Sequence, residues 1–337
     1  MSVLYHLTIF PPRLPECEAI SQEVNILRRH FGGSPVYVNP HQGLPIYIPR
    51  LLFGFHQLKE LRRLEIENHL HHLYNPDPFP FPYLRLLRRP VIYSITGGVA
   101  NKRINTRFFA SLSAVTVYDE ESLKYLRAIG LENIVWIPPG IDTSRFSCTP
   151  LPLRSEMRLL VGSAPWTKAQ FQSKGIDALL DAAKRLPRLH LIFLWRGVLA
   201  DVMEEKVRHL GLEGRVQVLN HQVDVNCILA NVHAAVALAE KPTIIRSYPH
   251  SLMESLAAGK PVLVSRNIPM AGYVEKTGCG VVVEQVTPDA IMAAIDVLMS
   301  RYDDFQRTSQ MVGPRDFSIQ KVIQAWGETY ERVRASR

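Results

Sequence analysis

The sequence predicts an α/β protein built from two Rossmann-like, doubly wound domains. Three observations support this fold class. Short apolar segments alternate with amphipathic helical patterns along the whole chain. The chain has 337 residues, which is more than one hydrophobic core usually supports. Residues 151–157, which include a proline and show little hydrophobic periodicity, have the character of a linker between two such series.

The first half predicts a mostly parallel sheet, because its apolar segments are separated by helices rather than by tight hairpins. Strands are expected at residues 3–10, 35–40, 45–49, 69–74, 91–96, 114–119 and 134–140. Helices are expected at residues 18–30, 51–67, 82–89, near Arg107 and at 120–128. A turn at Gly97 and Gly98 follows the strand at 91–96.

The second half repeats the pattern with six strands and six helices, enough for a complete Rossmann-like domain. The strands are expected at residues 157–163, 189–195, 216–221, 234–239, 261–265 and 280–285. The helices are expected at 174–186, 199–210, 225–232, 252–258, 270–277 and 288–300. A last helix at 319–335 carries apolar side chains at helical spacing and needs a surface to cover.

These elements divide the chain into three parts. We expect an N-terminal domain at residues 1–150, a C-terminal domain at 151–315, and a terminal helical segment at 316–337 that packs back across the domain junction. Parallel sheets bind ligands at the carboxyl ends of their strands, so we expect the site in a cleft between two such edges.

Composition narrows the function classes. The formal charge of +8 and the pI near 9.3 indicate an anionic partner, but the basic residues come in short pairs and carry no nucleic-acid-binding signature. No apolar run approaches the roughly 20 residues of a membrane span, and the first residues lack a signal peptide, so a cytoplasmic protein is expected. The four cysteines form no metal or disulfide pattern. The first strand is not followed by a dinucleotide fingerprint, which argues against a dehydrogenase.

Residues 248–265 are the segment around which a site can be built. Ser251 and Glu254 have the spacing of a capping box at a helix start, and Gly259 stands where a left-handed helix end belongs. A helix N-terminus carries unpaired N–H groups and a partial positive charge, so the backbone at His250, Ser251 and Leu252 could hold a phosphate. The alternative is that Ser251 and Glu254 only cap the helix.

Five segments resemble the GT-B glycosyltransferases, in particular the large retaining group called family 4. They occur in the family's order over nearly the whole chain: PPGIDTSRF at residues 138–146, SKGIDALLDA at 173–182, HSLMESLAAGKPVLVS at 250–265, GCGVVVEQVTPDAIMAAI at 278–295 and FSIQKVIQAWGETYERV at 317–333. The resemblance implies a nucleotide-sugar donor in the C-terminal domain, an acceptor on the N-terminal domain, and no metal cofactor. It does not identify the substrate.

The resemblance also assigns donor-binding residues. Lys174 matches the phosphate-binding lysine of the family, and Glu254 matches the carboxylate that accepts hydrogen bonds from the ribose. The family's arginine before that lysine is absent; Lys168 is the nearest substitute, unless it is only an exposed loop charge. Arg196 ends the second strand of the C-terminal domain and either contacts the nucleotide or caps the strand.

Two positions depart from the family pattern. Arg246 stands where the first glutamate of the Glu-x7-Glu motif should fall, and Thr96, before Gly97, stands where a histidine is expected. Arg246 could pair with the donor phosphate or an acidic sugar, or could mark a changed or lost activity; with Lys174 it is the catalytic candidate. Thr96 and Gly97 are candidates for acceptor binding. The alternative is that they only form a plain turn at the end of a strand.

Other polar residues of the N-terminal half remain candidates. Residues 11–19 occupy the loop where the family places its acceptor segment, so Arg13 and Glu18 are acceptor-side candidates. On the strand at 69–74, His69 and His71 share a face and His72 points away; without a carboxylate at metal-ligand spacing we interpret them as structural. Paired arginines interleaved with leucines predict a peripheral membrane contact: Arg62, Arg63, Arg85, Arg88 and Arg89.

The sequence thus predicts a metal-independent, retaining glycosyltransferase that uses a nucleotide-diphosphate sugar and a glycan, lipid-linked or small-molecule acceptor. One alternative is a non-catalytic GT-B-like subunit that binds a sugar nucleotide or a partner, which the departures at Arg246 and Thr96 favour. The joint presence of Lys174, Glu254 and the helix start argues against a pure scaffold. A sugar-nucleotide epimerase on the same fold is a further alternative.

Overall fold

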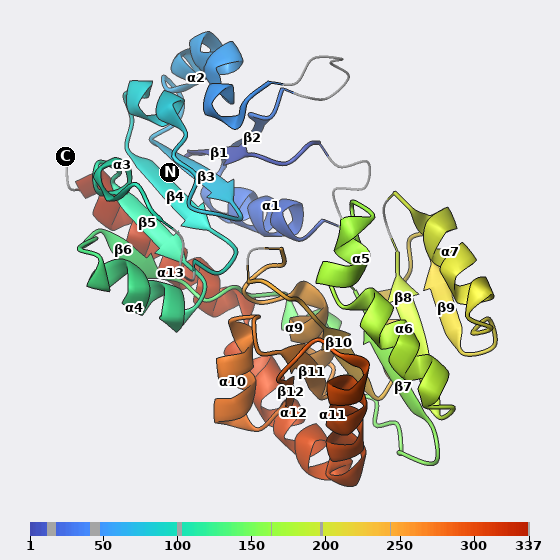
Figure 1. Ribbon diagram of the computed structural model, residues 1–337. Helices are drawn as coiled ribbons and strands as arrows, with labels where there is room; N and C mark the ends of the chain where they lie inside the picture. The colour runs from blue at the N-terminus through green and yellow to red at the C-terminus, as the bar shows by residue number, and fades with distance from the viewer. Residues whose placement is uncertain are drawn as a thin grey trace. The chain divides into compact units, whose positions relative to one another are not determined.

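The computed structural model describes residues 1–11, 18–40, 48–99, 103–162, 164–195, 198–242 and 244–335. The chain forms two compact units (Figure 1). Unit 1 contains residues 1–139 and 320–337, and unit 2 contains residues 140–319. The division between the units falls at Pro139, whereas the sequence placed it near residue 150.

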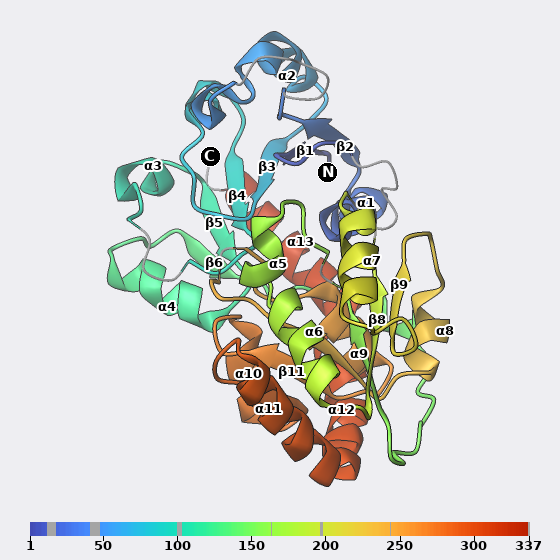
Figure 2. The same ribbon diagram turned by 45° about the vertical axis from the view of Figure 1, so that its right-hand side comes forward.

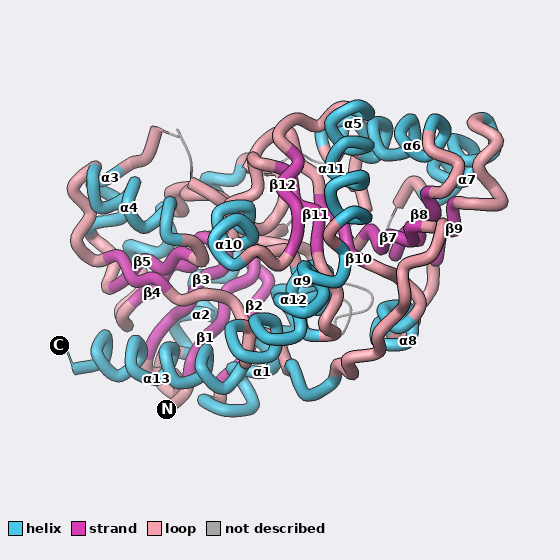
Figure 3. The backbone as a smooth tube through the Cα atoms, turned by 90° about the horizontal axis from the view of Figure 1, so that it is seen from below, coloured by secondary structure: helices cyan, strands magenta, loops and turns pink. Residues whose placement is uncertain are grey.

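Unit 1 is built on a six-stranded parallel sheet in the order β2-β1-β3-β4-β5-β6. Its strands are β1 (Val3–Leu7), β2 (Gly33–Tyr37), β3 (Leu70–Asn75), β4 (Val91–Ile95), β5 (Ala114–Val117) and β6 (Ile134–Trp136). Its helices are α1 (Ala19–Phe31), α2 (Leu58–Leu64), α3 (Thr106–Ala110), α4 (Glu120–Ala128) and α13 (Ile319–Ala335). Figure 3 shows α1 and α13 along one face of this sheet.

The segment between β2 and β3 differs from its prediction. The expected strand at 45–49 falls partly outside the described residues, and Ile48 and Pro49 are not in a strand. The expected helix at 51–67 is instead two 3-10 turns, Arg50–Leu52 and Phe55–Gln57, followed by α2. Gly54 separates the two turns with a φ of 81°, a left-handed conformation that cannot continue a right-handed helix. The expected helix at 82–89 is a 3-10 helix over Pro82–Leu86.

A buried chain of hydrogen bonds crosses one face of the unit 1 sheet. His71 Nε2 lies 3.0 Å from Glu65 Oε1, and His71 Nδ1 lies 2.8 Å from His6 Nε2. His6 Nδ1 in turn lies 2.9 Å from the Tyr83 hydroxyl. These contacts agree with the prediction that His71 is structural, and its carboxylate partner Glu65 comes from the loop six residues earlier. Burial lowers the pKa of both His6 and His71, so both rings are neutral at pH 7.

His72 points to the opposite face, as the strand alternation predicts, and there it holds the terminal helix. Its Nδ1 lies 2.8 Å from the Tyr330 hydroxyl of α13, and its Nε2 lies 2.6 Å from Ser94 Oγ of β4. Trp326 and Tyr330 are fully buried. The apolar stripe of α13 therefore covers the sheet of unit 1, which supplies the apolar surface that its helical pattern requires.

Unit 2 has a second six-stranded parallel sheet, in the order β12-β11-β10-β7-β8-β9 (Figure 1). Figure 2 shows its strands β8, β9 and β11 from a second side. Its strands are β7 (Met157–Val161), β8 (Leu189–Leu194), β9 (Val216–Leu219), β10 (Ala234–Ala237), β11 (Val262–Ser265) and β12 (Gly280–Val283). All six lie within the predicted segments. Its helices are α5 (Ala169–Ser173), α6 (Ile176–Arg185), α7 (Ala200–His209), α8 (Val225–Ala230), α9 (His250–Ala257), α10 (Met270–Thr277), α11 (Pro288–Ser300) and α12 (Tyr302–Asp316).

Two helices of unit 2 were not predicted, α5 and α12. Helix α12 contains Pro314 near its end and few apolar residues, which hides its helical pattern. Gly313 explains how it packs: a Cβ at that position would lie 1.9 Å from the carbonyl oxygen of Leu256 in α9. The absent side chain lets the two helix backbones come close.

Candidate functional site

The connection order of unit 2 locates a binding crevice. From β7 the chain builds β8 and β9 on one side and then returns to place β10, β11 and β12 on the other. The switch point therefore lies between β7 and β10, and open parallel sheets bind ligands beyond the carboxyl ends of the strands at such a point. Gly162 follows β7 there, and Leu238 to Glu240 follow β10.

The N-terminus of α9 stands at this crevice. A Cβ added to Gly162 would lie 2.5 Å from the Cβ of Ser251 and 2.8 Å from its Oγ, so these two residues are in direct contact. The predicted capping box was wrong. Helix α9 begins at His250, with Pro249 as its N-cap and no side-chain cap among the described residues, so Ser251 lies inside the first turn. The N–H groups of Leu252 and Met253 donate to the carbonyl oxygen of Pro249. The helix N-terminus still carries the partial positive charge that favours an anion.

Lys174 is the buried cation of the crevice. Only 9% of the residue is exposed, and its Nζ donates a hydrogen bond of 2.8 Å to the carbonyl oxygen of Ala164, two residues after Gly162. Burial lowers the pKa of Lys174 to about 8. An anion bound nearby would offset the desolvation of the ammonium.

The loop that carries Lys174 is fixed by its neighbours. Lys174 ends α5, and Gly175 follows with a φ of 66°, the left-handed conformation that reverses the chain into α6. A Cβ at Gly175 would lie 2.7 Å from Leu238 Cβ. Phe171 of α5 packs against Trp195, which follows β8, with ring centroids 5.8 Å apart. The loop is thus held against the ends of β8 and β10.

Arg246 lies on the segment that enters α9. Its Nη1 is 3.1 Å from His250 Nε2. Because a guanidinium only donates, His250 accepts this bond with Nε2 and carries its own proton on Nδ1. The contact directs Arg246 toward the first residue of α9 and therefore toward the same helix N-terminus that Ser251 occupies.

The other predicted donor residues are placed as follows. Glu254 is half-buried on the second turn of α9. Leu252 is fully buried and its N–H donates to the carbonyl oxygen of Pro249 at 3.0 Å, so the structure does not offer the predicted Leu252 N–H to a ligand. Lys168 is exposed at the start of α5, as the alternative of a loop charge requires. Arg196 lies outside the described residues.

The acceptor-side candidates lie in unit 1. Thr96 follows β4, and its N–H donates to the carbonyl oxygen of Asn75 at 2.9 Å; the N–H of Gly97 donates to Pro76 at 3.0 Å. The Thr96 hydroxyl is buried and forms no hydrogen bond within the described residues. Glu18 caps α1, because its carboxylate accepts the N–H of Ser21 at 2.8 Å. Arg13 lies outside the described residues.

Sequence reasoning missed two residues of the crevice. Gly162 was predicted within the strand at 157–163, whereas β7 ends at Val161 and Gly162 follows it at a close backbone approach to α9. Trp195 was read as the last residue of a strand, and its role in supporting α5 depends on a contact that the linear pattern does not show.

The crevice can stabilise an anion with a helix N-terminus and a buried ammonium. Such groups favour a reaction in which negative charge grows on a leaving phosphate. In the part of the chain that the structure describes, no group of three His, Cys, Asp or Glu side chains is arranged to hold a metal ion. Within the same residues, no helix is long and apolar enough to cross a membrane.

Comparison with known families gives a match in unit 2. Residues 168–311 match the family model described as "Glycosyl transferases group 1". The match includes Lys174, Arg246 and α9. No curated protein sequence matches the chain.

Solved structures match the fold over almost the whole chain. A sucrose-phosphate synthase from Thermosynechococcus elongatus aligns with a TM-score of 0.73 at 14% identity and covers 100% of both chains. A glycosyltransferase from Rickettsia africae aligns with a TM-score of 0.72 at 13% identity over 98% of each chain. Anabaena Alr3699/HepE in complex with UDP aligns with a TM-score of 0.71 at 14% identity over 98% of this chain and 100% of that one. The fold is GT-B, and together with the family match it supports an enzyme of the glycosyltransferase class.

Proposed function

We propose that this protein transfers a sugar from a nucleotide-diphosphate sugar to a glycan, lipid-linked or small-molecule acceptor, with retention of configuration and without a metal ion. One observation carries the proposal. A buried lysine, Lys174, bonds the carbonyl of Ala164 after β7, and the N-terminus of α9 contacts Gly162 at the end of the same strand, at the topological switch point of the unit that matches the glycosyltransferase model. This is the place where a diphosphate would be held.

Each group would act on the leaving phosphate. The ammonium of Lys174 and the N–H groups of α9 would neutralise charge as the bond to the sugar breaks. The Glu254 carboxylate would accept hydrogen bonds from the ribose. Retention without a protein nucleophile fits a front-face reaction in which the leaving phosphate deprotonates the acceptor hydroxyl. Arg246, held by His250, would then contact the transferred sugar or the phosphate next to it.

The candidate donor nucleotides can be ranked for testing. A solved neighbour, Anabaena Alr3699/HepE, was crystallised with UDP and with UDP-glucose, so UDP sugars are the first donors to test. Calorimetric titration with UDP, GDP, ADP and CMP identifies the base. Hydrolysis or transfer of the matching sugar nucleotide, followed by NMR, shows the anomeric configuration of the first product. We expect binding of one diphosphate, an α product from an α donor, and a rate unchanged by EDTA.

The rival function is a non-catalytic subunit that binds a sugar nucleotide or a partner. It predicts nucleotide binding without turnover for every donor and acceptor mixture tested. Absence of nucleotide binding would contradict both the transferase and the subunit that binds a sugar nucleotide, and would leave only the subunit that binds a partner.

A peripheral membrane contact is the second part of the proposal, at the cytoplasmic face of a membrane. Five exposed arginines of unit 1 lie on the same segments as exposed apolar side chains. This basic and apolar surface consists of Arg62, Arg63, Arg85, Arg88 and Arg89 with Leu51, Leu52, Phe55, Ile66 and Leu86. Such a mixture fits an anionic lipid surface, where the arginines meet headgroups and the apolar side chains enter the interface.

A further inference from the structure

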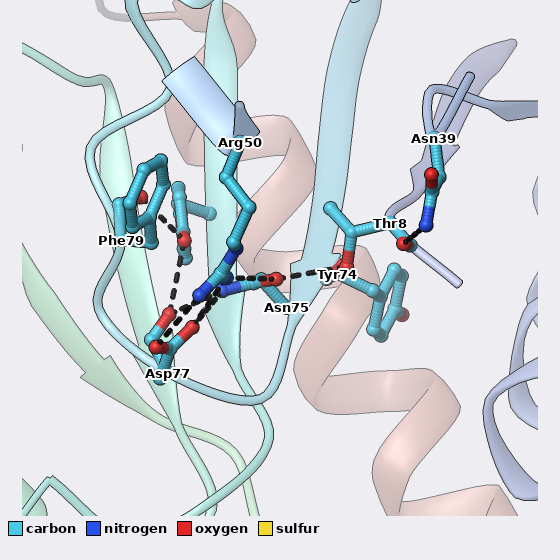
Figure 4. Close-up of polar contacts among 8 residues, drawn as sticks. Thr8, Asn39, Arg50, Tyr74, Asn75, Asp77 and Phe79 are labelled. Atoms are coloured by element: carbon cyan, nitrogen blue, oxygen red, sulfur yellow. Dashed lines mark hydrogen bonds and ion pairs between the residues drawn. The ribbon is translucent and has the colours of Figure 1, made fainter. Parts of the chain in front are cut away.

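Unit 1 has its own topological switch point, and a polar cluster occupies it. From β1 the chain goes to β2 on one side and then to β3 on the other, so the switch lies between β1 and β3. Thr8 follows β1 and Asn75 ends β3. The Thr8 hydroxyl donates to Asn75 Oδ1 at 2.8 Å, which joins the two strand ends across the switch (Figure 4). Ligands of open parallel sheets bind at this position.

An ion pair extends the cluster toward solvent. Arg50 donates to both carboxylate oxygens of Asp77, with Nη2 2.7 Å from Oδ1 and Nη1 3.1 Å from Oδ2. Arg50 Nη2 is also 3.3 Å from Asn75 Oδ1, and Asn75 Nδ2 donates to Asp77 Oδ1 at 2.6 Å. Figure 4 shows Arg50 descending from its 3-10 turn past the ring of Phe79 to Asp77.

The cluster is held rigidly. The guanidinium of Arg50 stands 4.2 Å from the centroid of the Phe79 ring. The Tyr93 hydroxyl lies within hydrogen-bonding distance of two carbonyl oxygens of the same loop, 3.0 Å from that of Asp77 and 2.8 Å from that of Phe79. Asn75 is fully buried. A site whose polar groups are fixed before the ligand arrives binds more tightly, because less ordering is needed on binding.

The exposed part of the pair has a definite chemistry. The side chain of Arg50 is 38% exposed and that of Asp77 is 24% exposed, so a donor and an acceptor face solvent side by side. An anionic ligand would gain little from Arg50, because the Asp77 carboxylate already neutralises the guanidinium and would repel the ligand. Two neighbouring hydroxyl groups fit both partners, since a hydroxyl can accept from the guanidinium and its neighbour can donate to the carboxylate.

We propose that Arg50 and Asp77, positioned by Asn75 and Thr8, bind a vicinal diol of a neutral sugar residue and so determine which acceptors unit 1 takes. This inference rests on the proposed sugar transfer for its meaning, but the subsite itself is a property of unit 1. The recognised group is an uncharged pyranose rather than a phosphate or a carboxylate.

The test is binding of simple glycosides to the full chain, measured by saturation-transfer difference NMR. The probes are the methyl glycosides of glucose, galactose and mannose, methyl glucuronide as the anionic arm, and a methyl 2,3-dideoxyglucoside that lacks the diol. We expect signal from at least one neutral glycoside and none from the dideoxy compound. Arg50→Gln and Asp77→Asn should each reduce that signal at least fivefold.

The matched control is Glu60→Gln, which breaks another ion pair of unit 1, that of Glu60 with Arg63 at 2.6 Å on the exposed surface. It should leave glycoside binding unchanged. Near-ultraviolet circular dichroism checks the fold of each variant, and Arg50→Lys offers a folded variant that keeps the charge but loses the fork. That variant should bind the glycoside more weakly than the wild type.

Three results would overturn the inference: no glycoside binding by the wild type, equal binding by folded Arg50 and Asp77 variants, or a preference for methyl glucuronide. UDP titration separates these outcomes from the proposed function. If the wild type does not bind UDP, the sugar-nucleotide proposal is wrong, but the glycoside-binding result remains valid. If the wild type binds UDP but no glycoside, the glycoside subsite is wrong and the sugar-nucleotide proposal remains.

Discussion

Ser251 in the first turn of α9 packs directly on Gly162 at the end of β7, and no side chain could be added to Gly162 without meeting it. The backbone of Gly162 is not left-handed, so glycine is required there by space rather than by φ. This contact sets the distance between the helix N-terminus and the strand end where the proposed diphosphate would lie.

Gly162→Ala should therefore damage the site. The new methyl group would overlap Ser251 Cβ at 2.5 Å and force α9 to shift, at a cost of about 1–3 kcal/mol in stability. Thermal melting should show the loss, and calorimetry should show weaker UDP binding. Gly214→Ala is the matched control, because a Cβ at Gly214 meets nothing within 4 Å. Adding Ser251→Gly should recover part of the loss; equal behaviour of the Gly162 and Gly214 variants would refute the steric argument.

Lys174 predicts a pH dependence of nucleotide binding. Burial places its pKa at about 8, so the free protein loses the ammonium as pH rises through that value. A bound diphosphate favours the charged form, and binding above about pH 8 must then take up a proton. Affinity for UDP should fall by up to roughly tenfold per pH unit above that point. Calorimetry between pH 7 and pH 9.5 measures it. Lys174→Arg, which stays charged, should flatten the curve.

Burial of the Lys174 ammonium lowers the stability of the folded chain, whereas the same ammonium is expected to strengthen UDP binding. The pKa of Lys174 is lower in the folded chain than its ordinary value of 10.5, so the unfolded chain binds more protons between about pH 8 and pH 10.5. Its contribution to folding is unfavourable below pH 8 and becomes less so as pH rises through that window. Lys174→Met should melt at a higher temperature than the wild type at pH 7, with the difference shrinking toward pH 10, while its UDP binding is weaker at pH 7. A lower melting temperature together with normal UDP binding would mean that Lys174 is structural.

We expect substitution of Arg246 to affect transfer of the sugar more than binding of the diphosphate. Its guanidinium is fixed by His250 at the start of α9, in the position where the resemblance places the transferred sugar. Arg246→Ala should lower turnover or change donor preference by more than it weakens binding of free UDP. Both are measured by comparing kcat and KM for two sugar nucleotides with the Kd for UDP. His250→Ala should have a smaller effect in the same direction. Wild-type turnover and preference in Arg246→Ala would make the residue a bystander.

The central strands β10 and β11 of unit 2 could be predicted from the sequence because they are buried throughout and therefore appear as short apolar runs. Strand β11, Val262–Ser265, is such a run, and its position agrees with the prediction. The start of helix α9, which precedes β11, was harder to predict. Ser251 and Glu254 match a capping box by spacing alone, but the structure begins α9 at His250 after Pro249, a residue whose fixed φ suits a helix entry.

The parts that the sequence could not predict depend on distant contacts. Thr8 and Asn75 are 67 residues apart, and Arg50 and Asp77 are 27 residues apart, so no local pattern joins them. Glu65 lies only six residues from His71, yet it pairs with it through a loop rather than along one helix or strand. Helix α12 was missed because its buried face mixes the apolar Tyr302, Phe305 and Val312 with Ser309 and Gly313, and the close approach at Gly313 is not visible in the sequence.

The basic and apolar surface predicts salt-dependent binding to anionic vesicles. Ile66 is 81% exposed and Leu86 is 41% exposed, beside arginines on the same segments. Ile66→Ser with Leu86→Ser removes apolar contact, and Arg85→Gln with Arg88→Gln removes charge. Each arginine near an anionic surface contributes about 1 kcal/mol, so the arginine pair should weaken binding by roughly thirtyfold.

Cosedimentation with vesicles that contain phosphatidylglycerol measures this contact. Binding should weaken as salt rises, because the Debye length shortens from about 30 Å at 0.01 M to about 8 Å at 0.15 M. The serine pair should reduce the binding that persists at higher salt, since apolar contact is not screened. Met311→Ser is the matched control: Met311 is 64% exposed but lies on α12 in unit 2, outside this surface, and its loss should change nothing. If the wild type fails to sediment even at low salt, or if Met311→Ser weakens sedimentation as much as the serine pair, this surface does not bind membranes.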